Sequence, residues 1–151
     1  MAPTTATIRS LLEKTAGNIA AKQANAGSLF QLGGLEEILA PNVKVEIPGF
    51  AVTVTGAEAI KSISPHPEFP ALASIIRLDK PLISTVTHVI GGGDDDMIVA
   101  ITSSKATTHS GKPWDHESVI VMHFNSQNQI DSLKAYIDTK SISEHIEASA
   151  A

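Results

Sequence analysis

Two histidines, His88 and His116, are the side chains of this chain best suited to chemistry. Both fall in stretches where apolar and polar residues alternate, so each is expected on one face of a β-strand. A histidine on an apolar face tends to be neutral, because desolvation disfavours its charged form. A neutral imidazole can accept a proton from a hydroxyl or a carbon acid and return it, which is general acid/base catalysis. The alternative is a core or rim histidine without chemistry.

These histidines belong to four predicted strands in the second half of the chain. Most of the four runs are rich in Val, Ile and Thr, and each is bounded by turn residues. The predicted strands cover residues 81–90, 97–109, 112–124 and 129–138. The turns between them are short, which predicts an antiparallel meander.

The register of the second and third predicted strands follows from the length of the turn between them. If residues 110–111 form a two-residue hairpin loop, Ile101 faces Ile120 and Lys105 faces His116. One face is then apolar at one end and polar at the other, where it also carries Ser103, Ser118 and Trp114. Such a gradient suits a ligand pocket with an apolar interior and a few polar groups that orient the ligand. An ordinary sheet face with a solvated end is the alternative.

The first predicted strand extends this face. Ser84 and His88 share it by period-two alternation. If the Gly-Asp turn of residues 91–96 closes the hairpin, His88 faces Ile101 and Ser84 faces Lys105. The alternative for His88 is a core ring bonded to a neighbouring hydroxyl.

Each remaining polar residue of this face has a functional and a plain interpretation. Lys105 would lower the pKa of His116, and together they could polarise a ligand carbonyl, or both could lie at the cavity rim with the lysine reaching water. Ser103 and Ser118 could orient a ligand or satisfy each other. Trp114 could be a pocket wall or packing beside a turn. The predicted ligand-contacting residues are Ser84, Ser103, Lys105, Trp114, Ser118 and Ile120.

The first half of the chain predicts mainly helices. Residues 5–25 and 28–40 carry apolar residues at helical spacing, and Gly33-Gly34 interrupts the second stripe. The sequence further predicts strands at 43–47 and 51–54, short helices at 57–63 and 71–77, and a last helix from about 139 to 146. This order of elements is α+β, with helices packed on one face of a curved sheet.

Composition narrows the possible partners. The chain has 151 residues, which fit a single domain spanning 1–151, and a net charge of -5 without a basic run. Nucleic acid and anionic membranes are therefore not expected partners. There is no cysteine, and no histidine or aspartate set has metal-ligand spacing, so we expect no metal and no cofactor. The absence of a spanning-length apolar run or a signal-peptide pattern leads us to expect a cytoplasmic protein.

Four segments in a fixed order carry a family resemblance. They are residues 35–46 (LEEILAPNVKVE), 54–60 (VTGAEAI), 111–124 (beginning GKPW) and 130–138 (ending AYID). Together they resemble the NTF2-like superfamily, in its SnoaL-like and ketosteroid-isomerase-like branch. The resemblance implies a cone-shaped α+β fold with helices packed on a curved, mostly antiparallel sheet, often dimeric through the outer sheet face.

A fifth segment, residues 87–92, resembles the H-x-I-G-G stretch of scytalone dehydratase and related SnoaL-like proteins. The histidine of that stretch faces the cavity and does acid/base work, so the resemblance implies this role for His88. The second cavity histidine of the dehydratase falls nearest Thr107, and the two acidic positions of ketosteroid isomerase fall nearest Ile47 and Ile120. Those enzymes' full sets of site residues are therefore not present.

The resulting prediction is a cofactor-independent cyclase, isomerase or dehydratase. It would act by general acid/base catalysis, through His88 and His116, on a small hydrophobic oxygenated molecule. The resemblance to SnoaL-like proteins suggests a polyketide or terpenoid intermediate of secondary metabolism, and a homodimer. The alternative is a ligand-binding or dimerisation module of the same fold without chemistry.

Overall fold

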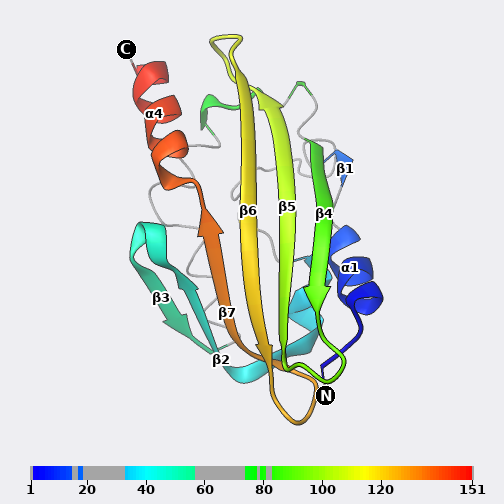
Figure 1. The fold of residues 1–151 in the computed structure, drawn as a ribbon. Coiled ribbons are helices and arrows are strands. Elements are labelled where there is room, and N and C mark those ends of the chain that lie inside the picture. The colour runs from blue at the N-terminus through cyan, green and yellow to red at the C-terminus, as the bar shows by residue number, and fades with distance from the viewer. Residues whose placement is uncertain are drawn as a thin grey trace.

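The structure, a computed structural model, describes residues 2–14, 17–18, 33–56, 74–77, 79–80 and 83–150. Its strands form one sheet in the order β1-β4-β5-β6-β7-β2-β3 (Figure 1). Neighbouring strands are antiparallel except β2 and β7, which run parallel. The elements are α1 (Thr5–Glu13), β1 (Gly17–Asn18), η1 (Gly33–Ile38), β2 (Leu39–Ile47), η2 (Pro48–Phe50), β3 (Val52–Thr55), β4 (Ile83–Gly91), β5 (Met97–Thr107), β6 (Pro113–Phe124), β7 (Ile130–Ile137) and α4 (Thr139–Ala150).

The predicted antiparallel meander is confirmed as strands β4 to β7, whose ends lie within about two residues of the expected ones. The last helix is also confirmed and runs past residue 146. Its first turn is capped by Asp138, since the backbone N–H of Ser141 donates to Asp138 Oδ1 at 3.0 Å. The predicted α+β class is correct.

The helix predicted for residues 5–25 ends earlier than expected, and residues 15–16 and 19–25 of it lie outside the described residues. Helix α1 ends at Glu13, and Gly17–Asn18 instead form a short strand paired with β4. Glycine is a poor helix former, so the apolar stripe alone overstated the helix length.

The next predicted elements are only partly described. Residues 33–38 form a 3₁₀ helix rather than an α-helix, and β2 begins at residue 39, before the expected start at 43. The predicted short helix at 57–63 lies outside the described residues, and so do residues 71–73 of the one at 71–77.

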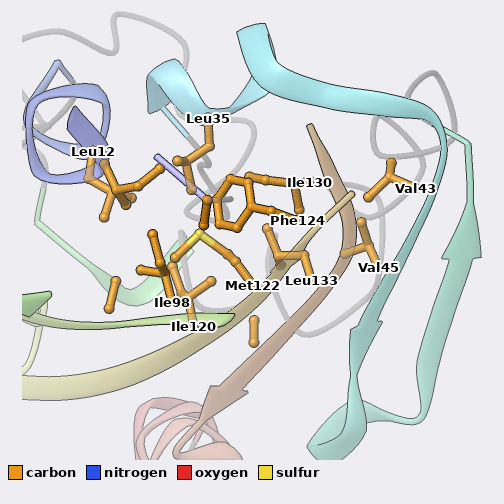
Figure 2. Packing of buried hydrophobic residues seen from close by; sticks show 14 of the residues in the cluster. Leu12, Leu35, Val43, Val45, Ile98, Ile120, Met122, Phe124, Ile130 and Leu133 are labelled. Atoms are coloured by element: carbon orange, nitrogen blue, oxygen red, sulfur yellow. The ribbon is translucent and has the colours of Figure 1, made fainter. Parts of the chain in front are cut away.

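One face of the sheet, which we call the inner face, packs against α1 and η1. Figure 2 shows Leu12 of α1 and Leu35 of η1 directed toward Ile98, Met122 and Phe124. These five side chains are buried. A second apolar cluster lies at the α4 end of the sheet and consists of Ile75, Ile76, Ala106, Trp114 and Ile142. The opposite, outer face has no described helix packed against it (Figure 1).

The predicted register of β5 and β6 is wrong by one residue. The loop between them has three residues, because the N–H of Thr108 donates to the carbonyl oxygen of Lys112 at 3.0 Å. Gly111 completes the turn with a φ of +83°, a conformation that glycine adopts without strain. Ala100 therefore faces Ile120, where Ile101 was expected. Since side chains alternate between faces, the whole of β5 is turned over relative to the prediction.

A β-bulge at Thr87 produces a second change of face. His88 faces Ile101, as predicted, but Ser84 faces Ser104 rather than Lys105, because the register shifts between residues 86 and 88. The bulge is held from two sides: Arg9 Nη1 donates to the carbonyl oxygen of Val86 at 2.8 Å, and Thr87 Oγ1 donates to that of Ile101 at 3.0 Å. The extra residue ends the alternation that would have placed His88 on the same face as Val86.

Candidate functional site

A band of small polar side chains crosses the inner face between the two apolar clusters. In register, Thr102 of β5 faces Ser118 of β6, and Ser104 faces His116. Ser84 of β4 faces Ser104 and extends the band by one strand. These five residues, which we call the polar band, are all half-buried. The alternation of β5 and β6 brings them together, although they come from three strands.

The middle of the polar band is already hydrogen-bonded. Thr102 Oγ1 and Ser118 Oγ lie 2.6 Å apart. This pair satisfies two hydroxyls that would otherwise be costly to bury. It separates the large apolar cluster from the end of the inner face that carries His116.

His116 lies against Trp114, two residues earlier on the same face of β6. The two rings are stacked, with centroids 5.1 Å apart and planes 6° from parallel. The indole is 4% exposed. The buried Trp114 Nε1 and His116 Nδ1 have no hydrogen-bond partner among the described residues. An unsatisfied buried polar atom costs about 1–3 kcal/mol, so these two nitrogens favour a bound acceptor or donor.

The surroundings of His116 favour the neutral form of its ring. Burial lowers the pKa of His116 below its ordinary value, and the carboxylate of Asp138 raises it by a smaller amount. A neutral imidazole has one nitrogen that donates and one that accepts a hydrogen bond. The ring can therefore both take and return a proton, which is the requirement for general acid/base chemistry.

The structure separates the predicted site residues into two groups. His116, Trp114, Ser118 and Ile120 lie on the inner face as predicted, and Ser84 lies there by register. The roles assigned to them stay predictions.

The predicted cavity position of the other three residues is wrong. His88 is exposed on the outer face beside Ile101, Lys105 is exposed beside Asp115, and Ser103 lies beside Glu117. Ser103 and Lys105 face outward because the loop after β5 has three residues. His88 faces outward because of the bulge at residue 87.

Sequence reasoning missed Thr102 and Ser104, which take the places expected for Ser103 and Lys105. Both faces of this part of β5 combine apolar and hydroxyl residues, so alternation could not choose between them. The signal that could have found them is Gly111, since glycine at the last position of a three-residue hairpin loop is common.

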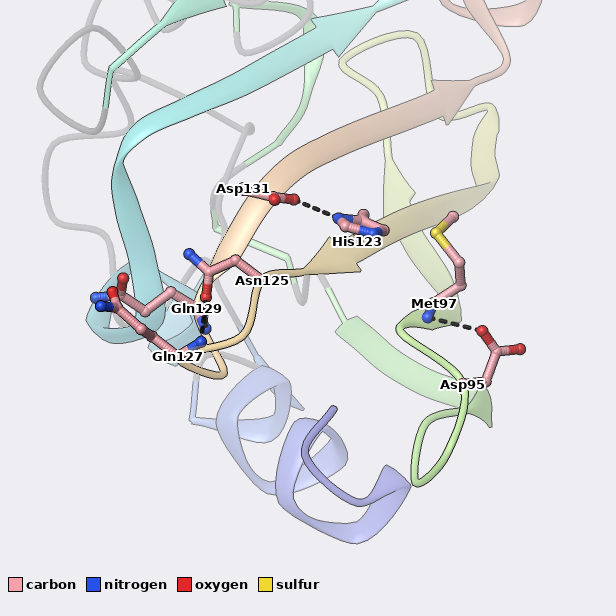
Figure 3. A network of polar contacts seen from close by, with 7 residues as sticks. All are labelled: Asp95, Met97, His123, Asn125, Gln127, Gln129 and Asp131. Carbon is pink, nitrogen blue, oxygen red and sulfur yellow. Dashed lines mark hydrogen bonds and ion pairs between the residues drawn. The ribbon is translucent and has the colours of Figure 1, made fainter. Parts of the chain in front are cut away.

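The outer face carries a second histidine of β6 in a different setting. His123 Nδ1 lies 2.5 Å from Asp131 Oδ1 (Figure 3). Nearby, Asn125 Oδ1 accepts hydrogen bonds from the backbone N–H groups of Gln127 and Gln129, at 2.9 and 3.0 Å. These contacts hold the β6–β7 turn, so His123 belongs to the architecture of the turn.

Other kinds of site find no support in the part of the chain that the structure describes. No group of three or more His, Cys, Asp or Glu side chains there is arranged to hold a metal ion. None of the helices described is both long enough and apolar enough to cross a membrane.

Comparison with solved structures identifies the fold. The "Putative Isomerase" of Rhodopseudomonas palustris is 15% identical, with a TM-score of 0.57 over 98% of this chain and 99% of that one. A protein with a ketosteroid isomerase-like fold from Catenulispora acidiphila is 14% identical, with a TM-score of 0.57 over 97% and 95%. TerC, co-crystallised with polyporic acid, is 18% identical, with a TM-score of 0.56 over 76% and 84%.

These similarities show that the chain has the fold of NTF2-like and ketosteroid-isomerase-like proteins, and the α+β fold predicted from the sequence is confirmed. No protein-family model matches the sequence, and no curated protein matches it either. At these levels of identity the similarity shows the fold, so function has to be argued from the site.

Proposed function

We propose that this protein is a cofactor-independent isomerase, cyclase or dehydratase in which His116 is the general acid/base. The observation that carries the proposal is the buried His116 Nδ1 without a partner, on a ring stacked against Trp114. Stacking fixes the ring plane, and burial keeps the ring neutral. A positioned histidine of this kind contributes typically about 10²–10⁴-fold to a rate. His88 has no part in the proposal, because it is exposed on the outer face.

The proposed substrate is a small hydrophobic oxygenated molecule, such as a polyketide or terpenoid intermediate. Apolar side chains, Ile120 and Ile142 among them, flank the polar band on both sides. Ser118 and Ser84 would orient polar groups of the ligand. TerC, which shares the fold, was co-crystallised with a small molecule, which supports a ligand on this kind of scaffold.

The test measures proton transfer directly and needs no knowledge of the natural substrate. In D₂O, the α-protons of 2-tetralone are exchanged by any base that reaches them, and NMR follows the loss of their signals. We expect the wild-type protein to accelerate the exchange and His116→Gln to remove the acceleration, with a nearly unchanged melting temperature. His123→Gln is the matched control, since it changes the same residue type on the same strand. Exchange that is unaffected by His116→Gln would rule out the proposed role.

A ligand-binding module without chemistry is the second candidate. The observation that favours it is the Thr102–Ser118 hydrogen bond, because each hydroxyl is satisfied by the other and not held ready for a ligand. This candidate predicts that hydrophobic ketones bind while their α-protons exchange at the rate of the protein-free solution.

We further propose that the protein is a homodimer through the outer face. Val99, Ile101, Val119 and Val121 form a continuous apolar surface there, and Ile90 at its edge is 57% exposed. Apolar surfaces of this kind mark interfaces.

The charges beside this surface suit a second copy of the chain. Lys134 and Glu46 lie 3.7 Å apart on the same face, so each of two copies would present both signs of charge. Light scattering should give the dimer mass for wild type and the monomer mass for Val121→Glu. A monomeric wild-type protein would contradict the proposal.

A further inference from the structure

The polar band is uncharged where the sequence had predicted a cation. Lys105, expected beside His116, lies on the outer face next to Asp115. On β5 and β6 the inner face of the band consists of hydroxyl and imidazole side chains only. A ligand bound beside His116 would therefore meet no lysine or arginine from these two strands.

The charges of Asp138 and Arg9 do not favour an anion at the band either. Burial lowers the pKa of His116, and the carboxylate of Asp138 opposes this by a smaller amount, so its field favours positive charge at this place. Arg9 reaches β4 from α1, but its guanidinium already donates to the carbonyl oxygens of Val86 and Thr87 and pairs with Glu13 at 3.5 Å. Its charge is thus largely compensated before any ligand binds.

The unpaired nitrogen of Trp114 defines what the site can bind. An indole N–H only donates, so it needs an acceptor. A carbonyl or ether oxygen placed there would recover the cost of the unpaired buried donor. A carboxylate would also accept the hydrogen bond, but it would lose its hydration without gaining a cation.

From this juxtaposition we propose that the site selects an uncharged ligand whose carbonyl or ether oxygen accepts a hydrogen bond from Trp114 Nε1, and that it rejects the carboxylate of the same shape. The proposal deepens the proposed function, because it rests on the same site beside His116. It names the substrate class as neutral ketones, lactones or ethers, and it separates them from free acids.

The chain provides its own probe for this test. Trp114 is its single tryptophan, so the intrinsic fluorescence of the protein reports this one place. The ligands are cyclohexyl methyl ketone and cyclohexanecarboxylate at pH 7, which have similar shapes and differ in charge. We expect the ketone to change the fluorescence and to bind at least about tenfold more tightly than the carboxylate, a difference of about 1.4 kcal/mol.

A variant then tests the hydrogen bond. Trp114→Phe keeps an aromatic ring beside His116 and removes the donor. By calorimetry, the variant should bind the ketone about 2- to 12-fold more weakly, which corresponds to the net worth of one hydrogen bond. Retention of the wild-type affinity for the ketone would overturn the role of Trp114 Nε1.

The wild-type comparison decides the proposal even if the variant does not fold. Equal or tighter binding of the carboxylate, or no binding of the ketone, would overturn the selection for neutral ligands. The fate of the proposed function is read separately, from the exchange of 2-tetralone protons. A protein that prefers the ketone but gives no exchange would keep this inference and lose the catalytic role of His116.

Discussion

His116 and His123 lie on the same strand, seven residues apart, and therefore on opposite faces of the sheet. His123 is bonded to Asp131 at 2.5 Å, and its side chain is 43% exposed. His116 is stacked on a buried indole, and its buried Nδ1 has no described partner. The two imidazole rings thus differ in whether Nδ1 can still form a hydrogen bond with a ligand. The exposed ring has used its Nδ1 for a turn, while the half-buried ring has an unpaired nitrogen.

The surroundings of His116 and of His123 should differ most in how much their packing contributes to stability. Trp114→Ala should lower the free energy of unfolding by about 3–5 kcal/mol, because it leaves a cavity in the cluster with Ile76 and Ile142. Met97→Ala, opposite His123 and 39% exposed, should change it by less than about 0.5 kcal/mol. Urea denaturation of both variants measures the contrast. Equal losses would mean that the two faces are packed alike.

The pH dependence of stability should distinguish the two histidines next. The pKa of folded His116 lies below its ordinary value of 6.5 because of burial. When the pH falls below about 6.5, the unfolded chain binds a proton that the folded chain does not accept, so stability decreases until the lower folded pKa is passed. His116→Gln should remove this part of the slope.

The control for that measurement is His123→Gln, which should keep the slope attributed to His116. Unfolding free energies of the three proteins between pH 5 and pH 8 provide the comparison. If the slope disappears with His123→Gln and persists with His116→Gln, the pH dependence of stability does not come from His116, and the prediction is wrong.

The smallest effect is expected from the His123–Asp131 contact on the outer face. Asp131→Asn should cost about 0.2–1 kcal/mol, because both side chains of the pair are partly exposed and screened by water. A double-mutant cycle with His123→Gln at low and high salt isolates the interaction. A coupling above about 2 kcal/mol, insensitive to salt, would show that this pair is as shielded as the inner face.

Alternation and turn chemistry were enough to predict the meander of four strands and the inner position of Trp114, His116, Ser118 and Ile120. The error in the register of β5 came from the length of the loop before β6. Because this loop has three residues and ends at Gly111, Thr102 and Ser104 lie on the inner face, where Ser103 and Lys105 were expected. Nothing local to β5 opposed this error, because its two faces have similar polarity over this stretch.

The sequence by itself determined the order of the elements and the α+β architecture, because apolar residues recur at the strand and helix periods along the whole chain. The tertiary structure decided which histidine faces inward. At Thr87, a hydrogen bond to β5 and the arginine of α1 hold one extra residue in β4. In a structure of period two, a single inserted residue exchanges the faces of everything after it, and here it sends His88 outward and leaves His116 at the candidate site.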